Sequence, residues 1–117
     1  QVLRWSFAAL STVETPILTG WFVGRMGGQG TKPAEALERW AQKRLAQLDE
    51  WLTGRTFVAT DDFTVADILM THVLSAGSTE PRLIEPHPHV RAYLARCLDR
   101  PAWKRTLDAY RARVEAV

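Results

Sequence analysis

The sequence has little cysteine, no long uninterrupted apolar run and almost no net charge. Cys97 is the only cysteine among 117 residues, so an internal disulfide scaffold is excluded. Glu14 interrupts the first apolar run before it reaches the ~20 residues of a membrane span, so we expect no signal peptide and no membrane partner. The formal net charge is +2, which does not by itself indicate a nucleic-acid partner. The expected compartment is the cytoplasm.

The remaining composition is that of an ordinary globular protein. Hydrophobic residues make up 46% of the chain and charged residues 24%, which argues against wholesale disorder. The length suits one domain over residues 1–117. Helical periodicity with no clear strand pair predicts an all-α bundle of five helices. The expected helices begin near residues 2, 33, 65, 89 and 101.

The first expected helix, residues 2–24, is apolar on most of its surface. Such a helix is either buried on several sides or lies at an interface. Pro16 removes a backbone donor within it and should kink it. The second expected helix opens at Pro33, carries an apolar stripe at helical spacing and stops before Gly54, a residue suited to a helix end.

The strongest local signal is a structural cap at residues 64–67. Thr64 as N-cap can accept from the Asp67 N–H, while the Asp67 side chain reaches back to the Thr64 N–H. Phe63 and Ile68 are spaced for a hydrophobic staple. We expect this box to start a central helix over 65–76, packed on all sides. Replacing Thr64 by Ala is expected to cost about 0.5–2 kcal/mol.

The C-terminal third is expected to hold a proline-rich loop and two helices. Residues 78–88 should form the loop, with one turn around residues 82–84. Residues 89–98 have apolar side chains on one side. The last helix starts at Pro101, and its stripe is expected to face inward: Trp103, Leu107, Tyr110 and Val114.

For three other patterns we favour a structural explanation over a functional one. His87 and His89 suggest a metal clip, but the ligand count is too low, so no metal is expected. Cys97 has no CxxC partner and lies on an apolar helical stripe, where a thiol is usually inert. The arginine-rich segment 91–113 lacks a recognition motif and is interpreted as a solvated face; nucleic-acid binding is the weaker alternative, and a salt series would test it.

Three stretches together resemble the C-terminal, all-helical domain of the glutathione S-transferase superfamily, especially its bacterial members. Residues 48–52 and 63–68 are similar to its "L-(D)-x-x-L … F-(S/T)-x-A-D-(I)" signature. Residues 88–94 and 100–103 are similar to its "P-x-(V/L)-x-x-(Y/W) … R-P-A" hinge, and residues 2–14 resemble its first long helix. The departure is at 59–62, where that family usually has a Gly-Asp pair.

The resemblance implies a five-helix bundle and a role in a two-domain enzyme. In that family a thioredoxin-like N-terminal domain binds the cosubstrate glutathione and carries the Tyr, Ser or Cys that activates its sulfur. No segment of these 117 residues resembles that domain, so the chain alone is expected to be inactive. The helical domain supplies a wall for a small hydrophobic electrophile and part of a homodimer interface. The parent protein would conjugate or reduce such electrophiles.

Four residues of the first helix are candidates for the substrate wall. Trp5, Ala9, Thr12 and Val13 fall on one face, where small side chains beside an aromatic could line an apolar cleft. The competing explanation is packing in the interior or at a dimer interface.

A second function from another class stays open. Helical modules of this superfamily are appended to translation factors and tRNA synthetases, where they mediate protein assembly without catalysis. The residues ahead of Gln1 would discriminate between the two, because a thioredoxin-like pattern ending in a Glu-Ser dipeptide supports the enzyme. We favour the transferase because the first helix is rich in Trp and Ala rather than polar.

Overall fold

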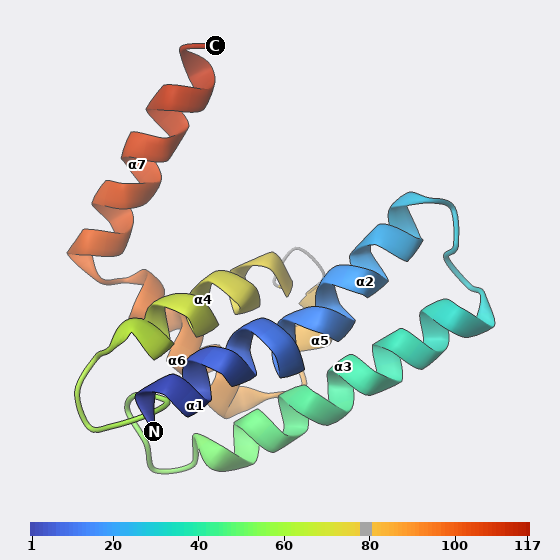
Figure 1. Cartoon of the computed structure of the whole chain (residues 1–117), viewed down its shortest axis with the longest axis horizontal. Coiled ribbons are helices and arrows are strands. Elements are labelled where there is room, and N and C mark those ends of the chain that lie inside the picture. The colour runs from blue at the N-terminus through green and yellow to red at the C-terminus, as the bar shows by residue number, and fades with distance from the viewer. Residues whose placement is uncertain (78–80) are drawn as a thin grey trace.

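A computed structural model describes residues 1–77 and 81–117, and the described part of the chain contains helices and no strands (Figure 1). The all-α class is therefore confirmed. In chain order the elements are α1 (Val2–Phe7), the π-helix η1 (Ala8–Val13), α2 (Glu14–Arg25), α3 (Lys32–Trp51), α4 (Val65–Gly77), α5 (Pro81–Ile84), α6 (Pro88–Leu98) and α7 (Pro101–Glu115). The first three run on as one rod, so the described residues form six helices instead of five. The additional one is the short α5, at the position of the expected single turn; residues 78–80 of the expected loop lie outside the described part.

The expected effect of Pro16 on the first rod takes the form of the π-helix η1. In a π-helix each N–H bonds the carbonyl five residues back, and the Glu14 N–H accordingly donates to the Ala9 carbonyl. Proline has no N–H to give the Ser11 carbonyl in this pattern. The Thr15 hydroxyl donates to that carbonyl instead. The rod therefore stays continuous through a buried proline.

Two glycines shape the ends of α3. The turn from α2 brings the Gly28 N–H within 2.8 Å of the Val23 carbonyl, and a Cβ at Gly28 would lie 2.5 Å from the Val23 side chain. At the other end, Gly54 has a φ of +71°, as expected of a residue that follows a helix. The α2–α3 hairpin extends away from the rest of the bundle at its far end (Figure 1).

The core forms where α4 packs against the first rod and α6. Met70 and Leu74 of α4 are fully buried, and Leu45 of α3 and Val90 of α6 join them. The expectation that α4 is packed on all sides is wrong, because Val65 and Ile68 are about half exposed. The α4 stripe that carries them therefore faces outward, away from the core. No helix of the described chain is long and apolar enough to cross a membrane.

The inward orientation expected for the α7 stripe is also wrong. Helix α7 projects from the body of the molecule (Figure 1) and contains no buried residue. Trp103 is half-buried, Leu107 is 37% exposed, and Tyr110 and Val114 are 63% and 57% exposed. Helical spacing identifies which side of α7 is apolar, but the described part of this chain does not cover that side.

Candidate functional site

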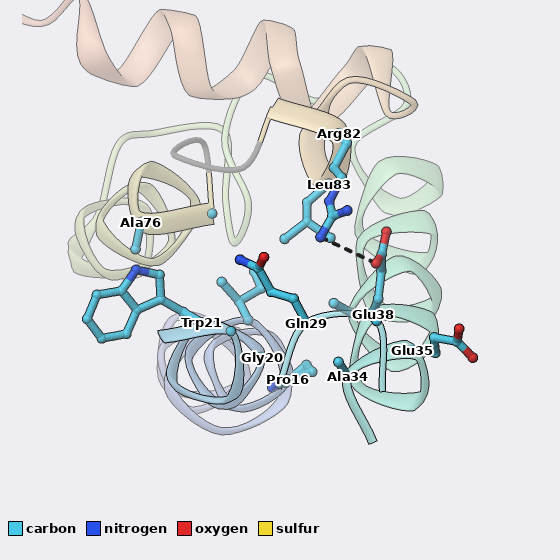
Figure 2. A pocket seen from close by; sticks show the side chains of 15 residues that line it. Pro16, Gly20, Trp21, Gln29, Ala34, Glu35, Glu38, Ala76, Arg82 and Leu83 are labelled. Atoms are coloured by element: carbon cyan, nitrogen blue, oxygen red, sulfur yellow. Dashed lines mark ion pairs between the residues drawn. The ribbon is translucent and has the colours of Figure 1, made fainter. Parts of the chain in front are cut away.

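A cleft of about 560 Å³ opens between the α2–α3 hairpin, the end of α4 and α5 (Figure 2). Its walls carry many small residues, including Gly20 and Gly24 of α2 and Ala34 and Ala41 of α3. Small side chains leave room for a molecule between two helices that would otherwise close together. The volume lies in the range of sites for small organic ligands.

Polar groups reach into the cleft from three segments. The Gln29 amide projects into its middle from the α2–α3 turn, and Glu38 of α3 faces Arg82 of α5 across it (Figure 2). The Arg82 guanidinium and the Glu38 carboxylate lie 3.6 Å apart. Glu35 also belongs to the lining residues, but its carboxylate points away from the cleft (Figure 2). The charged groups that face each other in the cleft are therefore Glu38 and Arg82.

The four residues predicted for the substrate wall do not line this cleft. Ala9 and Val13 are buried in the core, whereas Trp5 and Thr12 are only partly buried. The Trp5 ring packs on the Trp51 ring with centroids 5.0 Å apart. Ala9, Thr12 and Val13 all lie in η1, and π-helical turns are frequent at functional sites.

The Thr64–Asp67 cap differs in one half from the expected box. The Thr64 N–H donates to Asp67 Oδ2 at 2.9 Å, as the spacing of the two residues predicts. The Asp67 N–H donates to the Thr64 backbone carbonyl, while the Thr64 hydroxyl turns toward the carboxyl group at 3.4 Å. Asp67 also accepts from the Val58 N–H at 2.9 Å and from the Tyr93 hydroxyl at 2.8 Å. The fully buried Asp67 thus joins α4, the preceding loop and α6.

Cys97 and Tyr93 belong to this buried region and have no reactive character. Burial, the nearby Cys97 and the Asp67 carboxyl together raise the pKa of Tyr93 far above its ordinary range. Burial also raises the pKa of Cys97, so its thiol stays protonated at neutral pH. Neither group has the properties of a nucleophile, in agreement with the prediction for Cys97.

A second polar junction, besides the one around Asp67, joins α3 to residues 81–90. This segment comprises α5, the link to α6 and the first residues of α6, and we call it the α5–α6 connector. Gln42 Nε2 donates to the Arg82 and Leu83 carbonyls, at 3.3 Å each, and Gln42 Oε1 lies 2.7 Å from His87 Nε2. Two turns further along α3, Asp49 contacts His89. The two histidines considered as a metal clip are therefore engaged with α3. Among the described residues no group of three metal-ligating side chains occurs.

Asp49 caps α6 from another helix. Its Oδ1 accepts from the His89 and Val90 N–H groups at 2.8 and 2.9 Å, and its Oδ2 lies 3.1 Å from His89 Nδ1. Burial is the largest influence on Asp49 and raises its pKa, but these hydrogen bonds outweigh it, so the pKa is lowered. The carboxylate also meets the positive end of the α6 dipole.

The arrangement of helices agrees with a comparison against known families. The chain matches the family described as "Glutathione S-transferase, C-terminal domain" over residues 14–101, which is well over half of its length. The chain belongs to this family. The match includes α2 through α6, so the family resemblance of the sequence is confirmed for the bundle that holds the cleft and both polar junctions. No curated protein matches the chain.

Sequence reasoning missed Gln29, Gln42, Asp49 and Tyr93 as functional or structural polar residues. Each acts on a segment far away in the sequence or across a turn, so no local spacing marks it. Two signals were available: the interval of seven between Gln42 and Asp49 places both on one face of α3, and the family motifs at 48–52 and 88–94 contain Asp49 and Tyr93 without indicating their partners.

Proposed function

We propose that this chain is the helical half of a glutathione transferase. It supplies the wall that binds a small hydrophobic electrophile, and a thioredoxin-like domain supplies glutathione and the activating residue. The family match over residues 14–101 is the observation that carries this proposal. A thioredoxin-like domain contains a sheet, and the described residues contain no strand. Thiol activation is therefore assigned to a domain outside them.

An exposed apolar face on the first rod and α4 supports docking of such a domain. Phe7 is 66% exposed and Leu3 is 73% exposed, while Val65 and Ile68 are about half exposed on the neighbouring α4. Large apolar side chains exposed on two neighbouring helices can form an interaction surface. We name these four residues together with Leu10 the outer face, and we assign it to the thioredoxin-like domain.

The substrate wall is proposed for the stretch of the first rod that carries Trp5 and Thr12. Trp5 offers an aromatic surface, held by its contact with Trp51. Thr12 offers a small, partly exposed side chain on the π-helix. Ala9 and Val13 would act beneath them, by setting the position of the helix rather than by touching the electrophile.

The cleft of Figure 2 does not fit glutathione, the cosubstrate of the proposed reaction. Glutathione carries two carboxylates, and Arg82, the one basic side chain among the described lining residues, already lies 3.6 Å from the Glu38 carboxylate. A further carboxylate placed beside Glu38 would be repelled by it. Glutathione is accordingly assigned to the thioredoxin-like domain, which would also hold its sulfur for the reaction.

A homodimer is the second part of the proposal. Helix α2 exposes Leu18 and Phe22, with Met26 beyond its end, and α3 exposes Trp40. Helices α2 and α3 pack together, so both lie in one layer. A second subunit would cover their outer side. Sedimentation of the Phe22→Asp variant checks this: it should be monomeric at concentrations where the unsubstituted chain associates.

Turnover with glutathione and a chlorinated nitroaromatic tests the transferase proposal. The 117-residue chain alone should show only the background rate. The same chain, joined at Gln1 to the thioredoxin-like domain of a bacterial glutathione transferase, should exceed both the background and that domain alone. Trp5→Ala in the joined protein should raise the KM for the electrophile and leave the KM for glutathione unchanged.

Two results would contradict the proposal. Turnover by the chain alone would place the thiol-activating group within these residues. A joined protein that folds and binds glutathione but gains no turnover would favour the alternative, a non-catalytic assembly module of the same superfamily.

A further inference from the structure

The turn between α2 and α3 carries one polar side chain, that of Gln29, on a frame of glycines. Gly27 and Gly30 have φ of +80° and +75°, a conformation that residues with a Cβ rarely adopt. Between them, the Gly28 carbonyl accepts from both the N–H and the hydroxyl of Thr31. The backbone of this turn is therefore fixed, and it holds the Gln29 side chain at the cleft of Figure 2.

The Gln29 amide is available to a ligand in that cleft. The side chain folds back over α2, so that its Cγ and Nε2 lie 3.8 Å from the position of a Cβ built at Gly24. The amide projects into the middle of the cleft (Figure 2) and forms no hydrogen bond with a described residue. A carboxamide presents a donor beside an acceptor. Its complement is a molecular edge that carries an acceptor beside a donor.

Trp21 of α2 gives the same cleft an aromatic wall that is already held in place. Phe22 packs against its ring edge to face, with centroids 5.0 Å apart, and the Arg25 guanidinium lies 5.5 Å from the Trp21 centroid. Because these contacts order the ring before a ligand arrives, less conformational freedom is lost on binding. A flat ring molecule packs well on such a surface.

The charged groups that face each other in the cleft favour a neutral ligand. Glu38 and Arg82 lie 3.6 Å apart, so each already has a partner of opposite charge. A charged molecule would compete with one member of this pair for the other. A neutral molecule leaves the pair intact and uses the amide and the aromatic wall instead.

We propose that this cleft binds a neutral, flat ring molecule with a hydrogen-bond donor beside an acceptor on one edge, the pattern of lactams and nucleobases. Gln29 pairs with that edge, and Trp21 packs against the ring. The cleft volume of about 560 Å³ accommodates a small organic molecule. The site lies apart from Trp5 and Thr12 and does not depend on the proposed transferase function.

NMR titration of the isotope-labelled 117-residue chain with carbostyril, a neutral bicyclic lactam, tests the site. N-methylcarbostyril is the matched probe, because a methyl group replaces the N–H donor while the rings and the carbonyl remain. The side-chain NH2 of Gln29 and the indole N–H of Trp21 report on the cleft. The indole N–H of Trp5 reports on the proposed substrate wall.

Carbostyril should shift the Gln29 and Trp21 signals in a saturable manner and leave the Trp5 signal in place. N-methylcarbostyril should bind at least about fivefold more weakly, as expected for the loss of one hydrogen bond. Gln29→Ala should weaken carbostyril binding by about the same factor and remove the difference between the two probes. The matched variant Gln47→Ala, at an exposed glutamine of α3 outside the cleft, should bind as the unsubstituted chain does.

Three outcomes would overturn the proposal. The absence of saturable shifts at Gln29 and Trp21 would mean that the cleft does not take a lactam. Equal affinity for the two probes in the unsubstituted chain would mean that Gln29 does not pair with the lactam edge. Shifts at Trp5 in place of Trp21 would assign the molecule to the first rod. The probe comparison uses the unsubstituted chain, so it decides even if Gln29→Ala does not fold.

Discussion

Asp67 is the residue on which most of the local architecture depends. It is fully buried and accepts three short hydrogen bonds, of 2.8 to 2.9 Å, from the Val58 N–H, the Thr64 N–H and the Tyr93 hydroxyl. Only the Thr64 bond could be predicted, because a capping box has fixed local spacing. The other two depend on how the loop and α6 return to α4, which no local pattern specifies.

The two members of the cap should therefore differ in their effect on stability. Asp67→Ala leaves three donors without a partner, each costing about 1–3 kcal/mol when buried, so we expect a loss of at least about 3 kcal/mol. Thr64→Ala removes one long contact of 3.4 Å and should cost roughly 0.5 kcal/mol. Urea unfolding measures both variants. Equal losses would mean that the Thr64 hydroxyl has the larger role that the capping-box spacing predicts.

Asp49 should make stability depend on pH in acid. Its pKa in the folded chain is lower than the ordinary 3.8, so its contribution is fully present above that value and is lost as the pH falls through the folded-state value. Asp49→Asn keeps an oxygen for the His89 and Val90 N–H groups but does not titrate. The free energy of unfolding should then fall less steeply below about pH 4 than in the unsubstituted chain. Parallel curves would contradict this role.

At the scale of helices, α3 and α7 show what periodicity can and cannot predict. Both have an apolar stripe at helical spacing. In α3 the stripe is buried because the first rod and α6 cover it, as the sequence predicts. In α7 the stripe is exposed. Spacing identifies the apolar side of a helix, but the position of a covering surface depends on the tertiary arrangement.

Helix α7 should consequently contribute little to the stability of this chain. Deleting residues 105–117 removes no buried side chain, so we expect the free energy of unfolding to change by less than about 1 kcal/mol. Chemical denaturation of the shortened chain measures the change. A loss of several kcal/mol would mean that α7 packs on the bundle in solution.

The prediction of a kink at Pro16 did not specify that the helix would change to a π-helix, η1, ahead of the proline. Pro16 is expected to disturb the first helix, and the disturbance is a π-helix that precedes it. A missing N–H can be accommodated by a kink or by a change of hydrogen-bond register. In this rod the hydrogen-bond register changes, and the Thr15 hydroxyl donates to the Ser11 carbonyl.

At the scale of the whole molecule, large apolar side chains lie exposed on several helices. Leu3 and Phe7 on the first rod and Phe22 on α2 are at least half exposed. The proposed partner domain and second subunit would cover these side chains. The cleft could not be predicted, because it forms between helices whose separation the sequence does not specify.

The central claim is that a glutathione-binding domain docks on the outer face. It is tested most directly by measuring turnover of the joined protein after a substitution in that face. The measurement compares Phe7→Asp with the matched variant Tyr110→Asp, using glutathione and the chlorinated nitroaromatic. If the domain docks on the outer face, Phe7→Asp should reduce turnover at least about tenfold, which corresponds to about 1.4 kcal/mol. Tyr110→Asp should stay near the unsubstituted rate. Equal rates for the two variants, with both proteins folded, would contradict the assignment of this face to a glutathione-binding partner domain.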